Sequence, residues 1–229
     1  MEPHQRLKAA GKLITVSELW EKQDEAVVFF FSHQWTSDME PDHSGSQLLL
    51  LQDTLRRMAA GKMPPITATF SATAQGLRFP SLSTAESRRL TLRAFIWIDY
   101  ISVPQPDVEE DVEQRAVTAE QMKEAILSIP AYIKLSTVFM LVCPPVEHRD
   151  THTLCNVGSW LSRSWCRLEA LALLLQVGTN TPAIIVRSHG ATPVLLDPSG
   201  AAGLEPTRPS MSQHMGGPAA QLTSVPCPA

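Results

Sequence analysis

Val27-Val-Phe-Phe-Phe31 is an uninterrupted apolar run of β-branched and aromatic residues between polar flanks. Runs of this kind are typical of strands that are buried on both faces of a helix-covered sheet. Ala94-Phe-Ile-Trp-Ile98 and Val138-Phe-Met-Leu-Val142 have the same character, and Pro182-Ala-Ile-Ile-Val186 is a weaker fourth run. We therefore predict strands at these four positions, all in one sheet.

Helical signals fall between these runs. The predicted helices are Ser46–Met58, a short helix around Thr84–Leu92, Thr118–Ile129 and Ser164–Val177. Glycine or proline, which terminate helices, follow all of these except the short helix. Strands that alternate with helices favour right-handed crossovers, so the chain is predicted to be an α/β protein with a parallel sheet.

The chain divides by composition into three parts. Residues 1–24 form an N-terminal segment, and residues 25–190 carry the α/β domain with an irregular insertion at 62–83. Within the domain, Asp107–Glu113 is expected to be a solvated acidic loop. Residues 191–229 are rich in Pro, Gly, Ala and Ser and are expected to be a disordered tail.

Bulk composition excludes several classes of partner. The 229 residues are 44% hydrophobic, enough for one domain with a sizeable core. A formal net charge of -4 gives no general attraction to nucleic acid or to an anionic membrane. No apolar stretch is long enough for a spanning helix, and the first residues lack the apolar stretch of a secretory signal. We expect a cytoplasmic protein that binds neither nucleic acid nor membrane.

Polar side chains follow the first two predicted strands. Ser32, His33, Gln34 and Trp35 follow the first strand, and Asp99 and Tyr100 follow the second. Ligands of parallel sheets bind beyond the carboxyl ends of the strands, where the strand order reverses. This set suits a polar ligand with a flat aromatic part. The alternative, equally open from the residues alone, is that the two rings cap the core and Asp99 caps a turn.

Glu169 is a carboxylate on an otherwise apolar helix. Trp165 lies four residues before it and Leu173 four residues after it, so the three share a stripe. The run Ala170–Leu175 indicates a largely buried helix. A buried carboxylate costs free energy unless it is paired, hydrogen-bonded or functional. The alternative is a structural ion pair with Arg163 or another arginine.

Three sequence blocks resemble those of two related families. The blocks are Phe29–Trp35 (FFFSHQW), Trp97–Gln105 (WIDYISVPQ) and Arg163–Glu169 (RSWCRLE). Their order and rough spacing are similar to those of the fungal heterokaryon-incompatibility (HET) domain and of the TIR domain. The resemblance covers about residues 27–186. It implies a three-layer, flavodoxin-like (TIR-like) sheet of about four to five strands and a role in immune or self/non-self signalling.

The same resemblance implies hydrolysis of NAD at the nicotinamide–ribose bond, with NAD as a substrate and no bound cofactor. By position, Glu169 matches the catalytic glutamate, Ser32 and His33 match the loop that lines the nucleotide pocket, and Trp165 and Cys166 match the residues before the glutamate. A carboxylate can stabilise the oxocarbenium character that develops on the ribose. The alternative is a non-catalytic interaction module that associates with itself or with other TIR/HET-like domains.

A metal site is a weaker hypothesis. Cys143, His148, His152 and Cys155 form a C-x4-H-x3-H-x2-C pattern of zinc-ligating residue types. The spacing is not one of the common structural zinc patterns. We therefore predict no resident metal, with this cluster as the zinc alternative.

Overall fold

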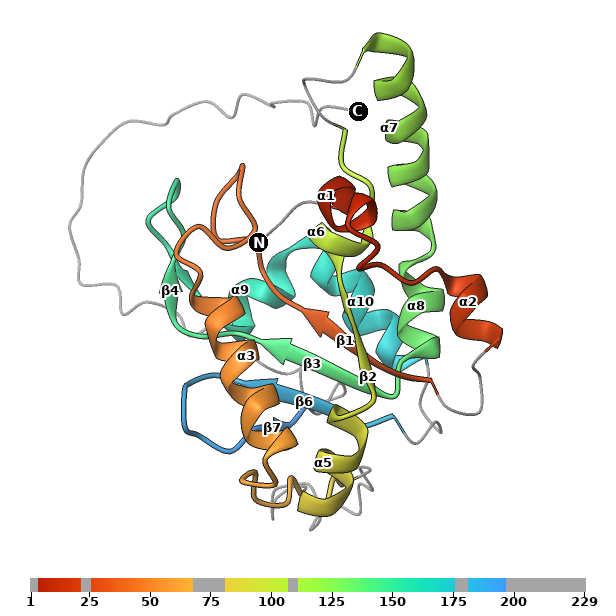
Figure 1. Cartoon of the computed structure of the whole chain (residues 1–229). Coiled ribbons are helices and arrows are strands. Elements are labelled where there is room, and N and C mark those ends of the chain that lie inside the picture. Colours follow the sequence, from red (N-terminus) through yellow and green to blue (C-terminus); the bar gives the residue numbers. More distant parts are fainter. Residues whose placement is uncertain (1–3, 22–25, 68–80, 107–110, 176–180, 197–229) are drawn as a thin grey trace, which may run out of the picture.

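A mostly parallel five-stranded sheet forms the middle layer of the molecule (Figure 1). The computed structural model describes residues 4–21, 26–67, 81–106, 111–175 and 181–196. The strand order is β2-β1-β3-β6-β7, with β1 (Val27–Ser32), β2 (Ala94–Ile98), β3 (Val138–Val142), β6 (Ala183–Val186) and β7 (Val194–Leu195). The first four strands are parallel, and β7 pairs antiparallel with β6. A separate hairpin joins β4 (Val146–Glu147) to β5 (Leu154–Cys155).

Helices lie on both faces of the sheet, which gives the three-layer, flavodoxin-like α/β arrangement predicted from the sequence (Figure 1). The helices are α1 (His4–Ala9), α2 (Val16–Glu21), α3 (Ser46–Ala59), α5 (Thr84–Thr91), α6 (Asp99–Ser102), α7 (Val112–Leu127), α8 (Ile129–Leu135), α9 (Val157–Ser162) and α10 (Ser164–Leu174). The helices α3 and α5 pack on one face, and α8, α9 and α10 pack on the other. None of the described helices is long and apolar enough to cross a bilayer.

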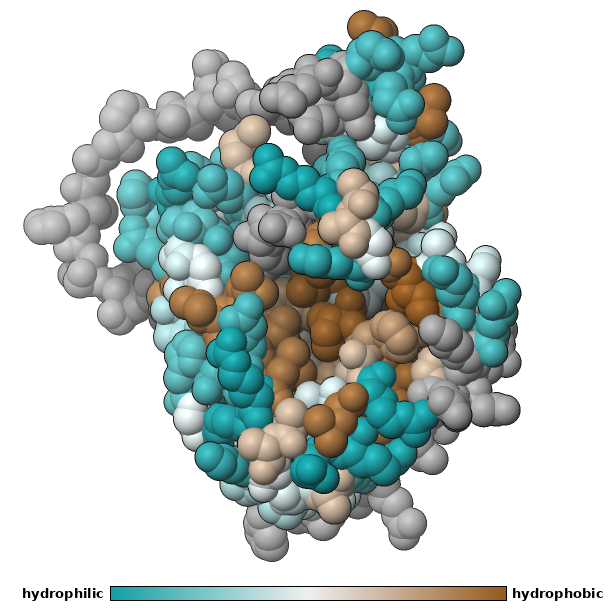
Figure 2. All heavy atoms as spheres, in the orientation of Figure 1, coloured by the Kyte–Doolittle hydropathy of each residue, from teal (hydrophilic) through white to brown (hydrophobic). Residues whose placement is uncertain are grey.

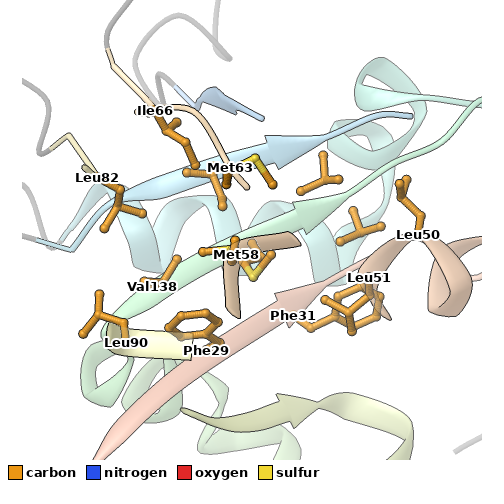
Figure 3. Close-up of a cluster of buried hydrophobic side chains, with 14 of the residues drawn as sticks. Phe29, Phe31, Leu50, Leu51, Met58, Met63, Ile66, Leu82, Leu90 and Val138 are labelled. Carbon is orange, nitrogen blue, oxygen red and sulfur yellow. The ribbon is translucent and has the colours of Figure 1, made fainter. Parts of the chain in front are cut away.

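The aromatic residues of β1 fill the core on both faces of the sheet. Successive side chains of a strand point to opposite faces. Phe29 and Phe31 therefore pack with α3 and α5 (Figure 3), whereas Phe30 packs with α8, α9 and α10. Phe30 also stacks on Trp97 and Phe139, with ring centroids 4.3 Å and 5.4 Å apart. This one strand thereby joins the two halves of the core.

The four predicted strands are confirmed, with one difference in burial. β1 and β3 are buried along their whole length, as expected. β2 is buried only at Ile98, because it forms the edge of the sheet and has a neighbour on one side only. Figure 2 shows apolar residues surrounded by polar ones in the region where β2 lies in Figure 1.

Helix α7 begins six residues before the predicted start at Thr118. Asp111 is its N-cap and accepts a hydrogen bond from the Gln114 backbone N–H at 2.8 Å. The prediction of an acidic loop is therefore wrong for residues 112–113, and residues 107–110 lie outside the described ranges. Pro130 does not end the helical region, because it lies in the first turn of α8, where its missing N–H removes no helical bond.

The sheet extends past the predicted domain boundary at residue 190. β7 lies within the predicted tail and pairs with β6. The residues from 197 onward lie outside the described ranges. At the base of the predicted insertion, Ile66 pairs with Leu82 in an antiparallel bridge, and both side chains belong to the core. The middle of the insertion, residues 68–80, is likewise outside the description.

Candidate functional site

Ser32 and Glu169 meet at the carboxyl edge of the sheet. Ser32 is the last residue of β1, and Glu169 lies on α10, with 8% of its surface exposed. The Ser32 hydroxyl donates a hydrogen bond to Oε2 of Glu169. Burial raises the pKa of Glu169 to about 8, a rise that the Ser32 hydrogen bond opposes and the charge of Asp99 reinforces. The carboxyl therefore titrates close to neutral pH.

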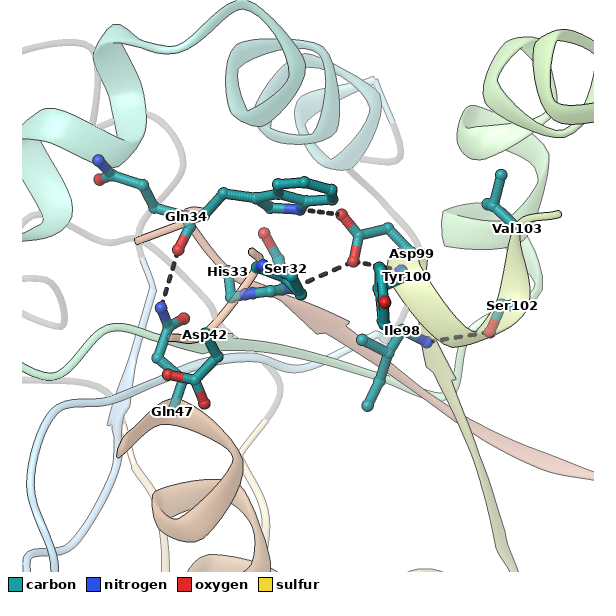
Figure 4. A network of polar contacts seen from close by, with 12 residues as sticks. Ser32, His33, Gln34, Asp42, Gln47, Ile98, Asp99, Tyr100, Ser102 and Val103 are labelled. Atoms are coloured by element: carbon teal, nitrogen blue, oxygen red, sulfur yellow. Dashed lines mark hydrogen bonds and ion pairs between the residues drawn. The ribbon is translucent and has the colours of Figure 1, made fainter. Parts of the chain in front are cut away.

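Asp99 gathers three hydrogen-bond donors at the start of α6 (Figure 4). Its carboxylate accepts from Nε1 of Trp35 at 2.9 Å and from the Tyr100 backbone N–H at 2.6 Å, and it contacts Nε2 of His33 at 3.0 Å. Burial favours the neutral acid, but the charge of His33 and these hydrogen bonds outweigh it, so the pKa of Asp99 lies below its usual range. Asp99 is thus a fixed anion beside a carboxyl that titrates.

His33 is held between the core and Asp99. Its ring stacks on Phe31 with centroids 4.7 Å apart, and its side chain is 1% exposed. Nδ1 of His33 is buried and has no hydrogen-bond partner among the described residues. The imidazole therefore presents its polar edge to Asp99 and its face to the core.

Trp35 and Tyr100 form a half-buried aromatic pair at this edge. Their ring centroids lie 6.1 Å apart at an interplanar angle of 79°, an edge-to-face arrangement. The bond from Trp35 to Asp99 fixes the orientation of the indole. The pair places two partly exposed aromatic rings directly beside the charged groups.

Gln34 connects the end of β1 to two helices instead of joining the Asp99 cluster. Its side-chain oxygen accepts from the Ser159 hydroxyl at 2.7 Å, and its carbonyl accepts from Nε2 of Gln47 at 2.8 Å. Both groups are therefore engaged in holding α9 and α3. This engagement favours a structural role for Gln34 over the predicted contact with substrate.

The helix α10 is buried on one side only, which corrects the prediction of a largely buried helix. Cys166 is buried, and burial followed by the charge of Glu169 raises the pKa of its thiol, which disfavours the thiolate. Trp165 is 52% exposed, so the stripe that it shares with Glu169 and Leu173 is not buried at this end. Leu171 and Leu175 are also exposed, because α8 and the sheet pack against the opposite side of α10.

Arg163 does not form the ion pair with Glu169 that was considered as an alternative. Its guanidinium donates to the Trp35 carbonyl at 3.3 Å. Its positive charge lowers the pKa of the nearby Cys166 thiol, but burial of that thiol raises the pKa by more. Arg163 therefore supplies a half-buried positive charge at the rim of the site.

Trp160 belongs to this site and was not predicted from the sequence. Its side chain is fully buried on α9, and its Nε1 donates to the Ser32 hydroxyl at 3.0 Å. The sequence does signal the helix, because Asn156 and Ser159 form a capping box at its start. The sequence contains no signal for the direction in which the Trp160 indole points.

The four residues of the zinc hypothesis do not converge. His152 is exposed and contacts Glu147 at 2.6 Å. Cys143 and Cys155 are buried, and burial, followed by the nearby Cys155, raises the pKa of Cys143 to about 12. No cluster of metal-ligating side chains within the described ranges contains these four residues.

A different group of three metal-ligating residues lies together within the described ranges. These are Asp38, His148 and Asp150, and their possible ligand atoms lie within 4.8 Å of one another. Nδ1 of His148 faces the backbone N–H groups of Asp150 and Thr151, each at 3.4 Å. An Nδ1 that accepts leaves the proton on Nε2, which points toward Asp38 at 3.9 Å. This tautomer is the wrong one for a metal at Nε2. The trio therefore connects the loop after β1 to the β4–β5 hairpin.

A scan against models of protein families and searches of curated proteins and of solved structures find no match to this chain. The fold and the site together define a flavodoxin-like α/β protein with two carboxyl groups of opposite pKa shift at the carboxyl edge of its sheet.

The substitution Ser32→Ala is expected to raise the pKa of Glu169 by about one unit, because the lost hydrogen bond stabilises the ionised carboxylate. Carbon-13 NMR titration of the glutamate side chains measures this value directly. The matched control is Ser44→Ala, an exposed serine that bonds only to Ser46 among the described residues, and it should leave the titration unchanged. A lowered or unaltered pKa in Ser32→Ala would contradict the assigned contact.

Proposed function

We propose that this protein is a TIR/HET-like signalling domain of the cytoplasm that hydrolyses NAD at the nicotinamide–ribose bond. The observation that carries the proposal is the buried carboxyl of Glu169, held by Ser32 at the edge of a parallel sheet where ligands bind. Carboxyl groups with strongly shifted pKa values concentrate at functional sites. The three sequence blocks that resemble the two families all contribute residues to this cluster.

The chemistry follows from the state of Glu169. Cleavage breaks the C1′–N bond, its electron pair leaves with nicotinamide, and the ribose gains oxocarbenium character. The ionised carboxylate stabilises that positive charge, and it accepts a proton from the water that adds to C1′. Because nicotinamide leaves as a neutral molecule, no second acid is needed. Activity is expected to rise with pH through about 8, the pKa of Glu169.

Neighbouring groups suit the rest of such a substrate. The Trp35–Tyr100 pair offers a face on which a heteroaromatic ring can stack. Arg163 adds a positive charge at the rim, which suits the pyrophosphate. Asp99 already accepts from three donors, so in this proposal it organises the aromatic pair and does not hold the substrate.

Nicotinamide release from NAD by concentrated purified protein tests the proposal. We expect release by the wild type and a loss of at least about 100-fold in Glu169→Gln, because the transition state loses its carboxylate. The matched control is Glu120→Gln on α7, whose side chain is 63% exposed, and it should retain full activity. Absence of release at every concentration, or equal release by Glu169→Gln, would refute the enzymatic function.

A second candidate, a non-catalytic module that associates with itself or with other TIR/HET-like domains, is favoured by one observation. Helix α10 exposes Trp165 and Leu171, and Leu175, the residue that caps its C-terminus, is 80% exposed. Exposed apolar groups on one side of a helix suit contact with another protein. If sedimentation shows association that Leu171→Glu abolishes, and no nicotinamide is released, this candidate replaces the first.

A further inference from the structure

The side chain of Trp160 makes a single hydrogen bond within the described residues, and that bond is with the site. The indole N–H can only donate, and it points at Oγ of Ser32 from 3.0 Å. The side chain has no exposed surface and packs in the core layer formed by α8, α9 and α10. A donor buried this completely has no water to replace Ser32, so the contact constrains both partners.

The indole determines the direction of the Ser32 hydroxyl. A hydroxyl has one hydrogen and two lone pairs. One lone pair of Ser32 receives the indole N–H, and the hydroxyl donates its hydrogen to its other partner, Oε2 of Glu169. Donation therefore runs in one direction, from Trp160 to Ser32 to Glu169.

This direction has a consequence for the carboxyl group. While Oε2 accepts the Ser32 hydrogen, a proton bound by Glu169 sits on Oε1. Oε1 makes no hydrogen bond with any residue in the described part of the chain. The two carboxyl oxygens of Glu169 therefore differ: Oε2 is hydrogen-bonded to Ser32, and Oε1 is free to exchange a proton.

We propose that Trp160 is a positioning residue: its indole orients the Ser32 hydroxyl and thereby selects Oε1 of Glu169 as the oxygen that exchanges a proton with the reacting water. The role of that water rests on the proposed function, whereas the chain of hydrogen bonds does not depend on turnover.

The other charged and titratable groups around Glu169 are known, so their influence can be held constant. They are Asp99 with its partner His33, Cys166 on the same helix, and Arg163 before it. The substitution Trp160→Phe alters none of them directly. A change in the titration of Glu169 in this variant therefore reports on Ser32.

A double-mutant cycle on the titration of Glu169, followed by carbon-13 NMR, is the decisive measurement. Trp160→Phe should raise the midpoint by about 0.5 unit or more, in the same direction as Ser32→Ala, because a freely rotating hydroxyl stabilises the carboxylate less. The double variant should titrate like Ser32→Ala alone, since Trp160 acts only through Ser32. An unchanged midpoint in Trp160→Phe, or full additivity in the double variant, would overturn the proposal.

Loss of the large ring can prevent folding, so a second measurement uses the intact indole. In a Trp35→Phe background, which removes the indole bonded to Asp99, one indole N–H resonance should shift with pH at the midpoint of Glu169. The pH dependence should vanish in Glu169→Gln and in Ser32→Ala. An indole signal that never titrates, or that titrates without Glu169, would exclude the proposed chain.

These measurements separate the two proposals. Coupled titration of Trp160 and Glu169 without nicotinamide release leaves the hydrogen-bond chain standing and removes the enzymatic function. Nicotinamide release that depends on Glu169 but is unaffected in rate and pH profile by Trp160→Phe removes the positioning role and leaves the function standing.

Discussion

Glu169→Gln is expected to stabilise the folded protein by about 2–5 kcal/mol at pH 8.5, while it removes the proposed activity. The pKa of Glu169 is about 8 in the folded state, against 4.5 for the unperturbed group. At a pH between these two pKa values, Glu169 holds a proton in the folded state that it has released in the unfolded state. Stability therefore falls as pH rises from about 4.5 to 8, and the full penalty applies above pH 8. Gln has the shape of the protonated acid, can still accept from Ser32, and carries no charge.

Urea denaturation of both proteins at pH 5 and at pH 8.5 measures this effect. At pH 5 the carboxyl is protonated in the folded state, so the gain should be small, and most of it should appear at the higher pH. Glu120→Gln, on the exposed side of α7, should change stability by less than about 0.5 kcal/mol at either pH. A difference between wild type and Glu169→Gln that does not vary with pH would show that the carboxyl is not held protonated.

Phe30→Ala is expected to lower the free energy of unfolding by about 3–5 kcal/mol. Phe30 has no exposed surface and stacks on both Trp97 and Phe139, so its removal leaves a cavity between three strands. Domains of ordinary size are stable by about 5–15 kcal/mol, so this is a large share of the total. Thermal or urea denaturation gives the value.

The control for Phe30→Ala is Leu127→Ala at the end of α7. That side chain is 72% exposed and fills no space in the core. We expect a change within about 0.5 kcal/mol. A loss below about 1 kcal/mol for Phe30→Ala would mean that the core rearranges around the cavity and that β1 is not the central support of the fold.

The apolar runs predicted the sheet well because their signal is local. β2 and β3 coincide with the runs quoted from the sequence, and β1 and β6 differ from theirs by one residue at an end. The same runs did not reveal that β2 lies at the edge. Edge position depends on strand order, which the sequence of a single strand does not encode.

The polar members of the site were predictable for a similar reason. In a parallel sheet the carboxyl ends of the strands share one edge, so Ser32 and Asp99 were expected near each other. Which of them are bonded was not predictable. His33 and Trp35 both contact Asp99, whereas Gln34, which lies between them in sequence, holds α9 and α3 instead.

By itself the sequence determined the kind and the position of most helices and strands, because apolar runs and helix caps act over a few residues. The resemblance implied that Ser32 and Glu169 share a pocket, but only the tertiary structure decided that they are hydrogen-bonded across 137 residues of chain and that Trp160 orients this contact. These side chains lie on separate elements, and their meeting depends on the order of the strands and on the side of the sheet against which α9 and α10 pack. Packing over such separations is a property of the whole core, so no single segment of the sequence specifies it.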